Sequence, residues 1–282
     1  MDHVLTEYGL RLTYLREPSA IDDLDQDRIL DDLSDDSLEG DFLPWLTRYK
    51  LADYDHLILV TDRCSGRYLG ILGACDGATN CEEFLLLETA FVAATARGHN
   101  LLRRMIALAL LRIGSLGTAP SVVAACTRSP ICYHVLRGIA HRITQATFFP
   151  ELADVSINFH TATLAQRIAR EIYPNSRFQV TAGIIRGAAP PADLRHYRHP
   201  SNNLQIDGLL CQTMQPADQI LAVLDLRGAD ETTIFDHARR LYRARQEAGS
   251  AGDSASRTSH LPMKKRQRID GGVGTSDGLS SG

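Results

Sequence analysis

The fold is decided by the stretch FVAATARGHNLLRRMI, residues 91–106. The residues before it, EFLLLETAFV at 83–92, are almost continuously apolar, which is typical of a strand in the middle of a sheet. After it, apolar residues recur at helical spacing from Leu101 to Ile113, and Gly114 and Gly117 end the pattern. The sequence therefore predicts a buried strand, a tight turn at residues 97–100 and a helix.

This turn has the chemistry of an anion site. The start of a helix exposes unpaired N–H groups and the positive end of the helix dipole, which suit a diphosphate. Arg97 adds a positive charge, and Gly98 lets a ligand come close to the backbone. Turns of this kind also join strands to helices without binding any ligand, so the neighbouring elements decide between the two interpretations.

Further strands and helices surround this unit. Alternating polarity predicts strands, and helical spacing after a Ser-Pro cap at residues 129–130 predicts a helix. The predicted strands span residues 9–16, 56–61, 68–74, 121–126, 178–185 and 219–226, and the predicted helices lie within 19–38, near 44–46 and over 129–139, 162–172 and 232–246. Turn residues at 62–66 predict that the strands at 56–61 and 68–74 form a hairpin. The fold class is α/β.

With its neighbours in place, the stretch at 91–106 resembles the cofactor motif of the GNAT superfamily of N-acetyltransferases. In that motif a strand ending in Val precedes Arg-Gly-x-Gly-x-Gly/Ala and a helix, and Val92, Arg97 and Gly98 fall at the expected positions. Asn100 and Leu102 replace its two later small residues. The segment AACTRSPICYHVLRG, residues 124–138, is similar to the family's fifth strand and following helix.

The resemblance covers residues 9–150 and implies a GNAT-like fold, with a mixed, mostly antiparallel central sheet flanked by helices. It implies transfer of an acetyl group from acetyl-CoA to an amine by direct attack. The expected coenzyme site consists of Val92, Arg97, Gly98, His99, Asn100, Leu101 and Leu102. Backbone N–H groups near Val92 would polarise the thioester carbonyl.

The resemblance also suggests catalytic residues. Tyr133 would protonate the leaving thiolate of CoA, with His134 as its substitute. Glu88 is the first choice for the base that takes the proton of the amine, with Glu83 and Glu82 as alternatives. Two other interpretations stay open: a domain that has lost catalysis and serves as a CoA-binding or regulatory module, and an enzyme for a longer acyl-CoA.

Composition and charge restrict the partners. The net charge of −4 argues against a general affinity for nucleic acid. Eight aspartates between residues 22 and 36 would either attract a cationic amine acceptor or form a solvated helix face. A calcium loop is rejected because Arg28 and Ser34 replace its essential Gly and Glu. The six cysteines lack a zinc-like arrangement with His, so neither a metal nor disulfides are expected.

The chain has no stretch suited to a signal peptide or to a membrane helix, which predicts a cytoplasmic protein without a membrane partner. One domain is predicted for residues 1–247, with its core at 9–150 and an extension at 151–247. Residues 248–282 have the composition of a disordered tail. Its basic run at 264–268 would direct the protein to the nucleus if it is read as an import signal. A basic loop at 195–199 would touch the 3′-phosphate of CoA or nothing.

Overall fold

The computed structural model describes residues 3–5, 9–18, 21, 23–35, 51–117, 119–152, 158–188, 201 and 203–243. The chain divides into two units, Met1–Arg245 and Gln246–Gly282, and every described residue belongs to the first. The predicted tail with its basic run at 264–268, the basic loop at 195–199 and the short helix near 44–46 all lie outside the described residues. The predicted domain boundary stays a prediction.

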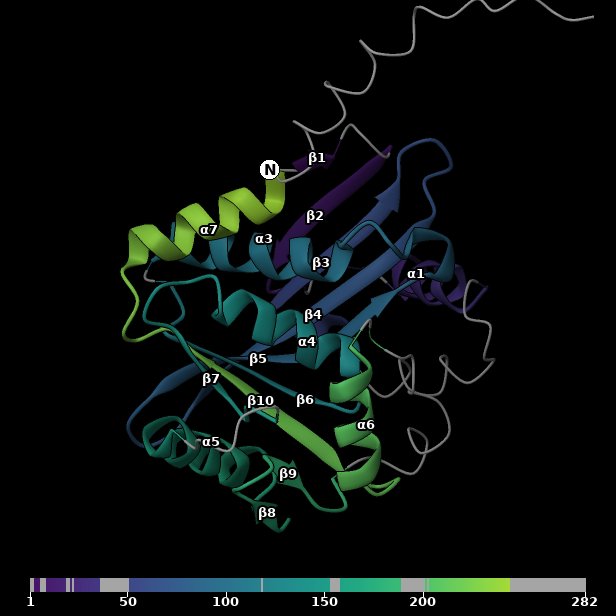
Figure 1. Ribbon diagram of the computed structural model, residues 1–282. Helices are drawn as coiled ribbons and strands as arrows, with labels where there is room; N and C mark the ends of the chain where they lie inside the picture. Colours follow the sequence, from purple (N-terminus) through teal and green to yellow (C-terminus); the bar gives the residue numbers. More distant parts are fainter. Residues whose placement is uncertain are drawn as a thin grey trace, which may run out of the picture. The chain divides into compact units, whose positions relative to one another are not determined.

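Within the described part of the chain, ten strands form one sheet in the order β1-β2-β3-β4-β5-β6-β10-β9-β8, with β7 paired to β10 (Figure 1). The strands are β1 His3–Leu5, β2 Leu10–Arg16, β3 His56–Asp62, β4 Tyr68–Ala78, β5 Glu83–Val92, β6 Val122–Thr127, β7 Thr147–Phe149, β8 Phe178–Gln179, β9 Ile184–Ile185 and β10 Gln219–Asp225. The pair β5–β6 is parallel, and the other pairs are antiparallel.

Helices cover this sheet. They are α1 Asp23–Asp35, α3 Leu101–Leu116, α4 Pro130–Ala140, α5 Phe159–Ile172, α6 Leu204–Thr213 and α7 Glu231–Arg243, with short 3-10 turns η2 Leu51–Asp53 and η3 Ala94–Ala96. The predicted fold class, a mixed and mostly antiparallel sheet flanked by helices, is confirmed.

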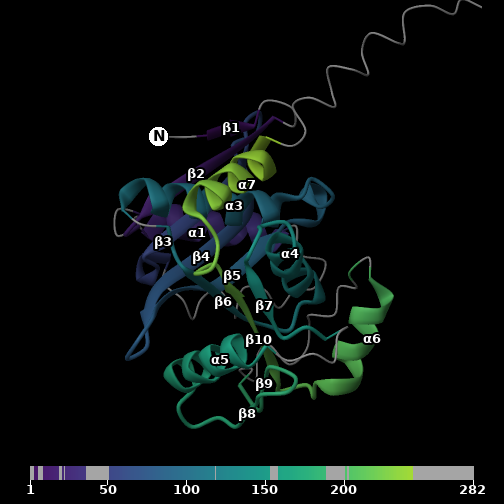
Figure 2. The same cartoon turned by 60° about the vertical axis from the view of Figure 1, so that its left-hand side comes forward.

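Alternate side chains of the central strands face two different layers. One set packs in the core that also contains residues of α3, α4 and α7: Leu85, Leu87, Val123, Ala125, Ala222 and Leu224. The other set packs in the core that contains residues of α5: Phe84, Leu86, Val122, Ala124, Leu221 and Val223. Figures 1 and 2 show α3, α4 and α7 next to one another and α5 apart from them, beside β8 and β9. The central strands are apolar on both faces because both faces are covered.

The strand predicted at 178–185 differs in the structure. It consists of β8 and β9, which pair with each other as a small hairpin. Gly183 between them has a positive φ of 65°, and its carbonyl accepts a hydrogen bond from the N–H of Leu221 at 2.8 Å. A left-handed residue cannot continue an extended strand, so the chain reverses there. Helix α6 and strand β7, which the sequence patterns do not predict, complete the second half of the chain.

Candidate functional site

The parallel pair β5–β6 is short. Only Leu85, Leu86 and Leu87 pair with β6, opposite Val123, Ala124 and Ala125, although β5 continues to Val92 and β6 to Thr127. We call the end of this pairing, at Leu87 and Ala125, the divergence point. Beyond it, the edge of β5 that faces β6 has backbone groups without a ladder partner on β6, and such an edge can accept an extended ligand.

Glu88 lies at the divergence point and is an extra residue in its strand. In the β4–β5 ladder Gly73 pairs with Thr89 and Ala74 pairs with Leu87, so Glu88 has no partner on β4. A bulge of this kind redirects a side chain and often lies beside a functional site. Glu88 is half-buried, and burial is the main cause that raises the pKa of its carboxyl, which Asp55 raises further.

Two thiols accompany Glu88. Burial, and then the charge of Glu88, raise the pKa of Cys75 to about 12 and that of Cys126 to about 12. Both groups therefore remain neutral thiols near neutral pH and are poor nucleophiles. The sequence predicts only that these cysteines bind no zinc, because their proximity to Glu88 depends on how three strands align. Of the three groups, Glu88 is the one suited to move a proton.

The loop after β5 brings β5 to the start of α3. The N–H of Ala93 donates to the carbonyl of Leu69 at 2.8 Å, and the Nε of Arg97 donates to the carbonyl of Val92 at 3.4 Å. Gly98 has a φ of 88°, and a side chain added there would meet no atom within 4 Å. The loop therefore approaches open space at the position where the sequence predicts contact with a diphosphate.

The two departures from the coenzyme motif are accommodated. Asn100 adopts the left-handed conformation, with φ 54° and ψ 30°, that a glycine would adopt easily and that Asn tolerates better than most residues. Its side chain makes no capping hydrogen bond to α3, so the first-turn N–H groups keep their capacity to bind an anion. Leu101 is buried, and Leu102 packs against the main core.

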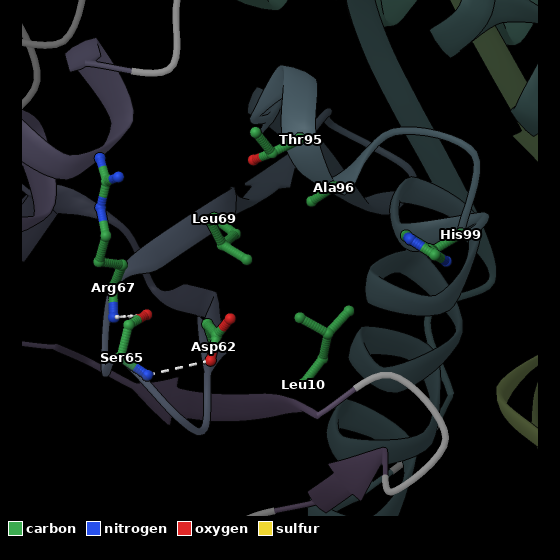
Figure 3. Close-up of a pocket in the computed structure, with 8 residues that line it drawn as sticks. All are labelled: Leu10, Asp62, Ser65, Arg67, Leu69, Thr95, Ala96 and His99. Carbon is green, nitrogen blue, oxygen red and sulfur yellow. Dashed lines mark hydrogen bonds between the residues drawn. The ribbon is translucent and has the colours of Figure 1, made fainter.

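Residues of this loop also line a cavity of about 310 Å³. Figure 3 shows Leu10 and Leu69 pointing into the space between the β3–β4 turn and the loop, with His99 on the side of α3. The remaining lining residues are Asp62, Ser65, Arg67, Thr95 and Ala96. The turn is held by the Asp62 carboxylate, which accepts the N–H groups of Cys64 and Ser65 at 2.6 and 3.1 Å. His99 thus borders a cavity with an apolar floor.

Tyr133 is fully buried in α4. Its hydroxyl donates to the carbonyl of Pro150 at 2.6 Å and accepts from the N–H of Leu152 at 3.2 Å, and its ring meets Phe148 edge-on with 5.2 Å between centroids. Burial raises the pKa of the hydroxyl to about 12. These contacts connect α4 to the segment after β7, so the residue has a structural role whether or not it also donates a proton.

The alternative catalytic residues lie in different surroundings. Glu82 pairs with Arg227, and Glu83 is exposed at the first residue of β5, about 16 Å of strand from Glu88 at roughly 3.3 Å per residue. His134 is half-buried, and the pKa of its imidazole is lowered by burial and then by Arg137. Of the acidic candidates, the structure therefore brings only Glu88 to the divergence point.

Helix α1, Asp23–Asp35, lies within the acidic segment at 22–36. Ile29, Leu30 and Leu33 are buried, whereas Asp25, Asp27 and Asp31 are exposed. Asp32 instead accepts the N–H of Tyr68 at 3.0 Å. The described carboxylates of α1 therefore fit the solvated helix face better than a concentrated acceptor site.

The described residues contain no group of three or more His, Cys, Asp or Glu side chains arranged to hold a metal ion. In the same part of the chain, no helix has the length and apolar character needed to cross a membrane.

A scan against models of known protein families finds no match, and a search of curated proteins finds none either. Solved structures do match. A GNAT family N-acetyltransferase (YhbS) from Escherichia coli, in complex with CoA, is 14% identical, with 47% of this chain and 69% of that chain covered and a TM-score of 0.35.

Two other solved structures are similar. Diaminobutyrate acetyltransferase EctA from Paenibacillus lautus, in complex with L-2,4-diaminobutyric acid and coenzyme A, is 15% identical, covers 79% of this chain and 99% of that chain, and has a TM-score of 0.38. The ribosomal-protein-S5-alanine acetyltransferase from Vibrio fischeri is 9% identical, with 52% of this chain and 86% of that chain covered and a TM-score of 0.36. The GNAT-like fold of this chain is seen in the strand order and in the parallel pair β5–β6 of the described residues.

Proposed function

We propose that this chain transfers an acetyl group from acetyl-CoA to the amine of an acceptor. The observation that carries the proposal is the divergence point together with the loop after β5, which contains the left-handed residues Gly98 and Asn100 and leads into the uncapped start of α3. The arm of the coenzyme contains amides that can pair with an unpaired strand edge, and its diphosphate suits a helix start. One ligand can therefore use both features at once.

The coenzyme contacts follow from this arrangement. The diphosphate lies against the backbone N–H groups of residues 98–102, with the guanidinium of Arg97 beside it. Arg97 already reaches back to the carbonyl of Val92, so its charge lies at the end of β5. The thioester carbonyl accepts a hydrogen bond from a backbone N–H near Val92, which stabilises the negative charge that develops on its oxygen.

Glu88 acts as the general base in this proposal. The amine nitrogen attacks the thioester carbon, the tetrahedral intermediate expels the CoA thiolate, and the proton of the amine passes to Glu88. A carboxyl whose pKa is raised toward neutrality is better suited to this task than an ordinary one. Asp55, whose charge acts on Glu88, also favours the approach of a cationic amine.

The leaving thiolate of CoA needs a proton, and Tyr133 stays the predicted donor of this proton. Its hydroxyl donates to Pro150, so it must release this bond before it can protonate a thiolate. This observation favours a second candidate function, in which the domain binds CoA or an acyl-CoA as a regulatory module without turnover.

Thermal unfolding with acetyl-CoA and with CoA tests the premise shared by both candidates. A ligand present at about 100 times its Kd should stabilise the protein by about 2.7 kcal/mol. Arg97→Gln should weaken this effect, and Arg239→Gln, an exposed arginine paired with Asp236 on α7, should not. If neither ligand stabilises the protein at millimolar concentration, both candidates fail.

Product detection then separates the candidates. The protein is incubated with a panel of amines, cationic and neutral, and with acetyl-CoA or longer acyl-CoAs. If an acylated amine forms in the presence of the protein and not in its absence, the protein is an enzyme. The acyl-CoA that reacts fastest then identifies the acyl group. Binding without product from any pair supports the regulatory module.

A further inference from the structure

The cavity beside the loop after β5 has no part in the proposed acetyl transfer. We call it the turn cavity, because the β3–β4 turn at residues 62–67 forms one of its walls. The start of β2 supplies Leu10, the start of β4 supplies Leu69, and the loop supplies Ala96 and His99. Its volume of about 310 Å³ lies at the lower end of the range of about 300–1,000 Å³ for sites that bind small molecules. The turn cavity therefore suits a small ligand.

The turn cavity and the divergence point lie on opposite sides of β5. In the strand order, β4 is one neighbour of β5 and β6 is the other. The turn cavity is lined from β2, β4 and the turn between β3 and β4, whereas the divergence point opens toward β6. A ligand in the turn cavity is therefore separate from a ligand at the divergence point, and the loop after β5 is what the two sites share.

Hydrogen bonds within the chain hold the walls of the turn cavity in place. The N–H of Arg63 donates to the carbonyl of Gly9 at 2.6 Å, which connects the turn to the residue before β2. The N–H of Ala93 donates to the carbonyl of Leu69 at 2.8 Å, which connects the loop to β4. Because these bonds form between protein groups alone, the site is preorganised and a ligand has little to order when it binds.

The ionic group that the turn offers to a ligand is negative. Oδ1 of Asp62 accepts the N–H groups of Cys64 and Ser65 at 2.6 and 3.1 Å, and within the described part of the chain Oδ2 accepts no hydrogen bond. Arg67 also lines the cavity, but in Figure 3 its side chain runs toward α1, where its Nε lies 3.5 Å from Oδ1 of Asp32. The Asp62 carboxylate therefore keeps one oxygen for a ligand.

The other two arginines near this turn are directed away from the cavity. Arg28 of α1 donates to the carbonyl of Gly66 at 3.1 Å, and its guanidinium lies 5.7 Å from the centre of the Tyr68 ring. Arg63 is exposed, and neither of these two arginines lines the cavity. The space beside Asp62 is therefore left to a ligand.

Apolar side chains form much of the remaining lining. Leu10 is 4% exposed and Ala96 is 3% exposed, and Leu69 is half-buried. Figure 3 shows Leu10 and Leu69 pointing into the cavity. An aliphatic chain placed against these side chains removes apolar surface from water, which favours binding.

We propose that the turn cavity binds a primary aliphatic ammonium ion, with Asp62 as the residue that recognises its charge. An ammonium group has three hydrogen-bond donors, and Oδ2 of Asp62 accepts one of them. A hydroxyl oxygen has two lone pairs, so Oγ of Ser65, which already accepts the N–H of Arg67 at 3.3 Å, accepts another. The aliphatic chain of the ligand lies against Leu10 and Leu69.

The ligand acts on the coenzyme through the shared loop, and this part of the proposal rests on the proposed function. Ala96 and His99 line the turn cavity, and Gly98 between them belongs to the loop that the proposed function places against the diphosphate. A ligand that packs against the loop favours the conformation in which it was bound. Because coupling between two sites is reciprocal, each ligand should raise the affinity for the other by the same factor, about fivefold or more.

The probe for the test is pentylammonium, compared with pentanoate and 1-pentanol, which have the same chain length and a different end group. In an NMR titration of the full chain without coenzyme, pentylammonium should bind about tenfold or more tightly than either analogue, because only it forms a charge-assisted hydrogen bond with Asp62. Intermolecular NOEs between its chain and the methyl groups of Leu10 and Leu69 locate the ligand in the wild type.

Asp62→Asn is the variant that tests the charge. Its amide oxygen still accepts the N–H groups of Cys64 and Ser65, so the turn is kept and only the negative charge is lost. The variant should lose the preference for pentylammonium. Glu83→Gln, at the exposed start of β5, is the matched control and should keep it. If Asp62→Asn does not fold, the three-ligand comparison and the NOEs in the wild type decide the question.

The outcomes separate this proposal from the proposed function. If pentylammonium binds no more tightly than pentanoate, gives no NOEs to Leu10 and Leu69, or binds equally well to Asp62→Asn, the ammonium site is overturned, and CoA binding still supports the proposed function. If pentylammonium binds as expected and CoA does not bind, the ammonium site stands and the proposed function fails. If both bind and neither changes the affinity for the other, the coupling through the loop is overturned.

Discussion

The two edges of β6 behave differently. Toward β10 the strand pairs antiparallel from Val122 to Thr127, over its whole length. Toward β5 it pairs in parallel at three positions and then separates from its neighbour. The same apolar sequence therefore forms a closed seam on one side and an open edge on the other.

This difference shows where the fold allows function. On the closed side, Val223 and Leu224 of β10 are fully buried in the two cores. On the open side, the next β5 residue is a half-buried carboxylate that the bulge displaces from its register. The closed seam supplies packing in both cores, whereas the open edge is where the proposed function places the ligand and Glu88.

The largest expected effect is on the closed seam. Leu224→Ala should lower the free energy of unfolding by about 2–5 kcal/mol, because it leaves a cavity beside a completely buried side chain. Cys126→Ala, beyond the last β5–β6 pair, should cost less than about 1 kcal/mol. Urea unfolding measures both; equal losses would mean that the two edges do not differ in packing.

Glu88→Gln probes the open edge. With an amine that the wild type acetylates, kcat should fall by about 100-fold or more, because the Glu88 base is lost. The affinity for CoA should be unchanged. Glu83→Gln, at the exposed start of the same strand, is the control and should retain its activity. A Glu88→Gln enzyme with wild-type kcat would remove Glu88 from the mechanism.

Tyr133→Phe should act on stability. The carbonyl of Pro150 and the N–H of Leu152 lose their partner in a buried setting, so unfolding should become easier by about 1–3 kcal/mol. The ratio of kcat between variant and wild type, measured well below the transition temperature, should stay near one if the role is structural. A large fall in kcat with unchanged stability would instead support the acid that the resemblance implies.

At Asn100 two replacements should have opposite effects. Asn100→Gly should raise stability by at most about 1 kcal/mol, since glycine adopts a positive φ without strain. Asn100→Val should lower it by about 1–3 kcal/mol, because a β-branched residue is strained there. Differential scanning calorimetry compares the two, and a stabilising valine would contradict the left-handed conformation.

The smallest expected effect is the dependence of stability on pH. The pKa of Glu88 is raised above its ordinary value of 4.5, so the folded state binds its proton more tightly than the unfolded state does. The ionised carboxylate therefore lowers stability as the pH rises through the folded pKa, and this penalty is absent below about 4.5. Glu88→Gln should be more stable than the wild type near neutral pH, and the gap in Tm should close toward pH 4. A gap that widens in acid would mean that the pKa is lowered instead.

The sequence by itself determined the local units of this protein. An apolar run predicted β5, helical spacing predicted α3, and Ser129 before Pro130 predicted the start of α4, where the Ser129 hydroxyl accepts the N–H of Cys132 at 3.4 Å. These features arise from neighbouring residues, because periodicity and caps act over a few positions of the chain. The loop at residues 97–100 belongs to this group, since its Gly and Asn carry their own backbone preferences.

Only the tertiary structure decided which side chains meet. The bulge at Glu88 depends on the register with β4, and the role of the Tyr133 hydroxyl depends on Pro150 and Leu152. Helix α3 packs against α7, which lies more than a hundred positions later in the chain, and no local pattern contains such a contact. The divergence point has the same origin, because β6 separates from β5 while it pairs fully with β10, and strand pairing is chosen by packing between distant segments.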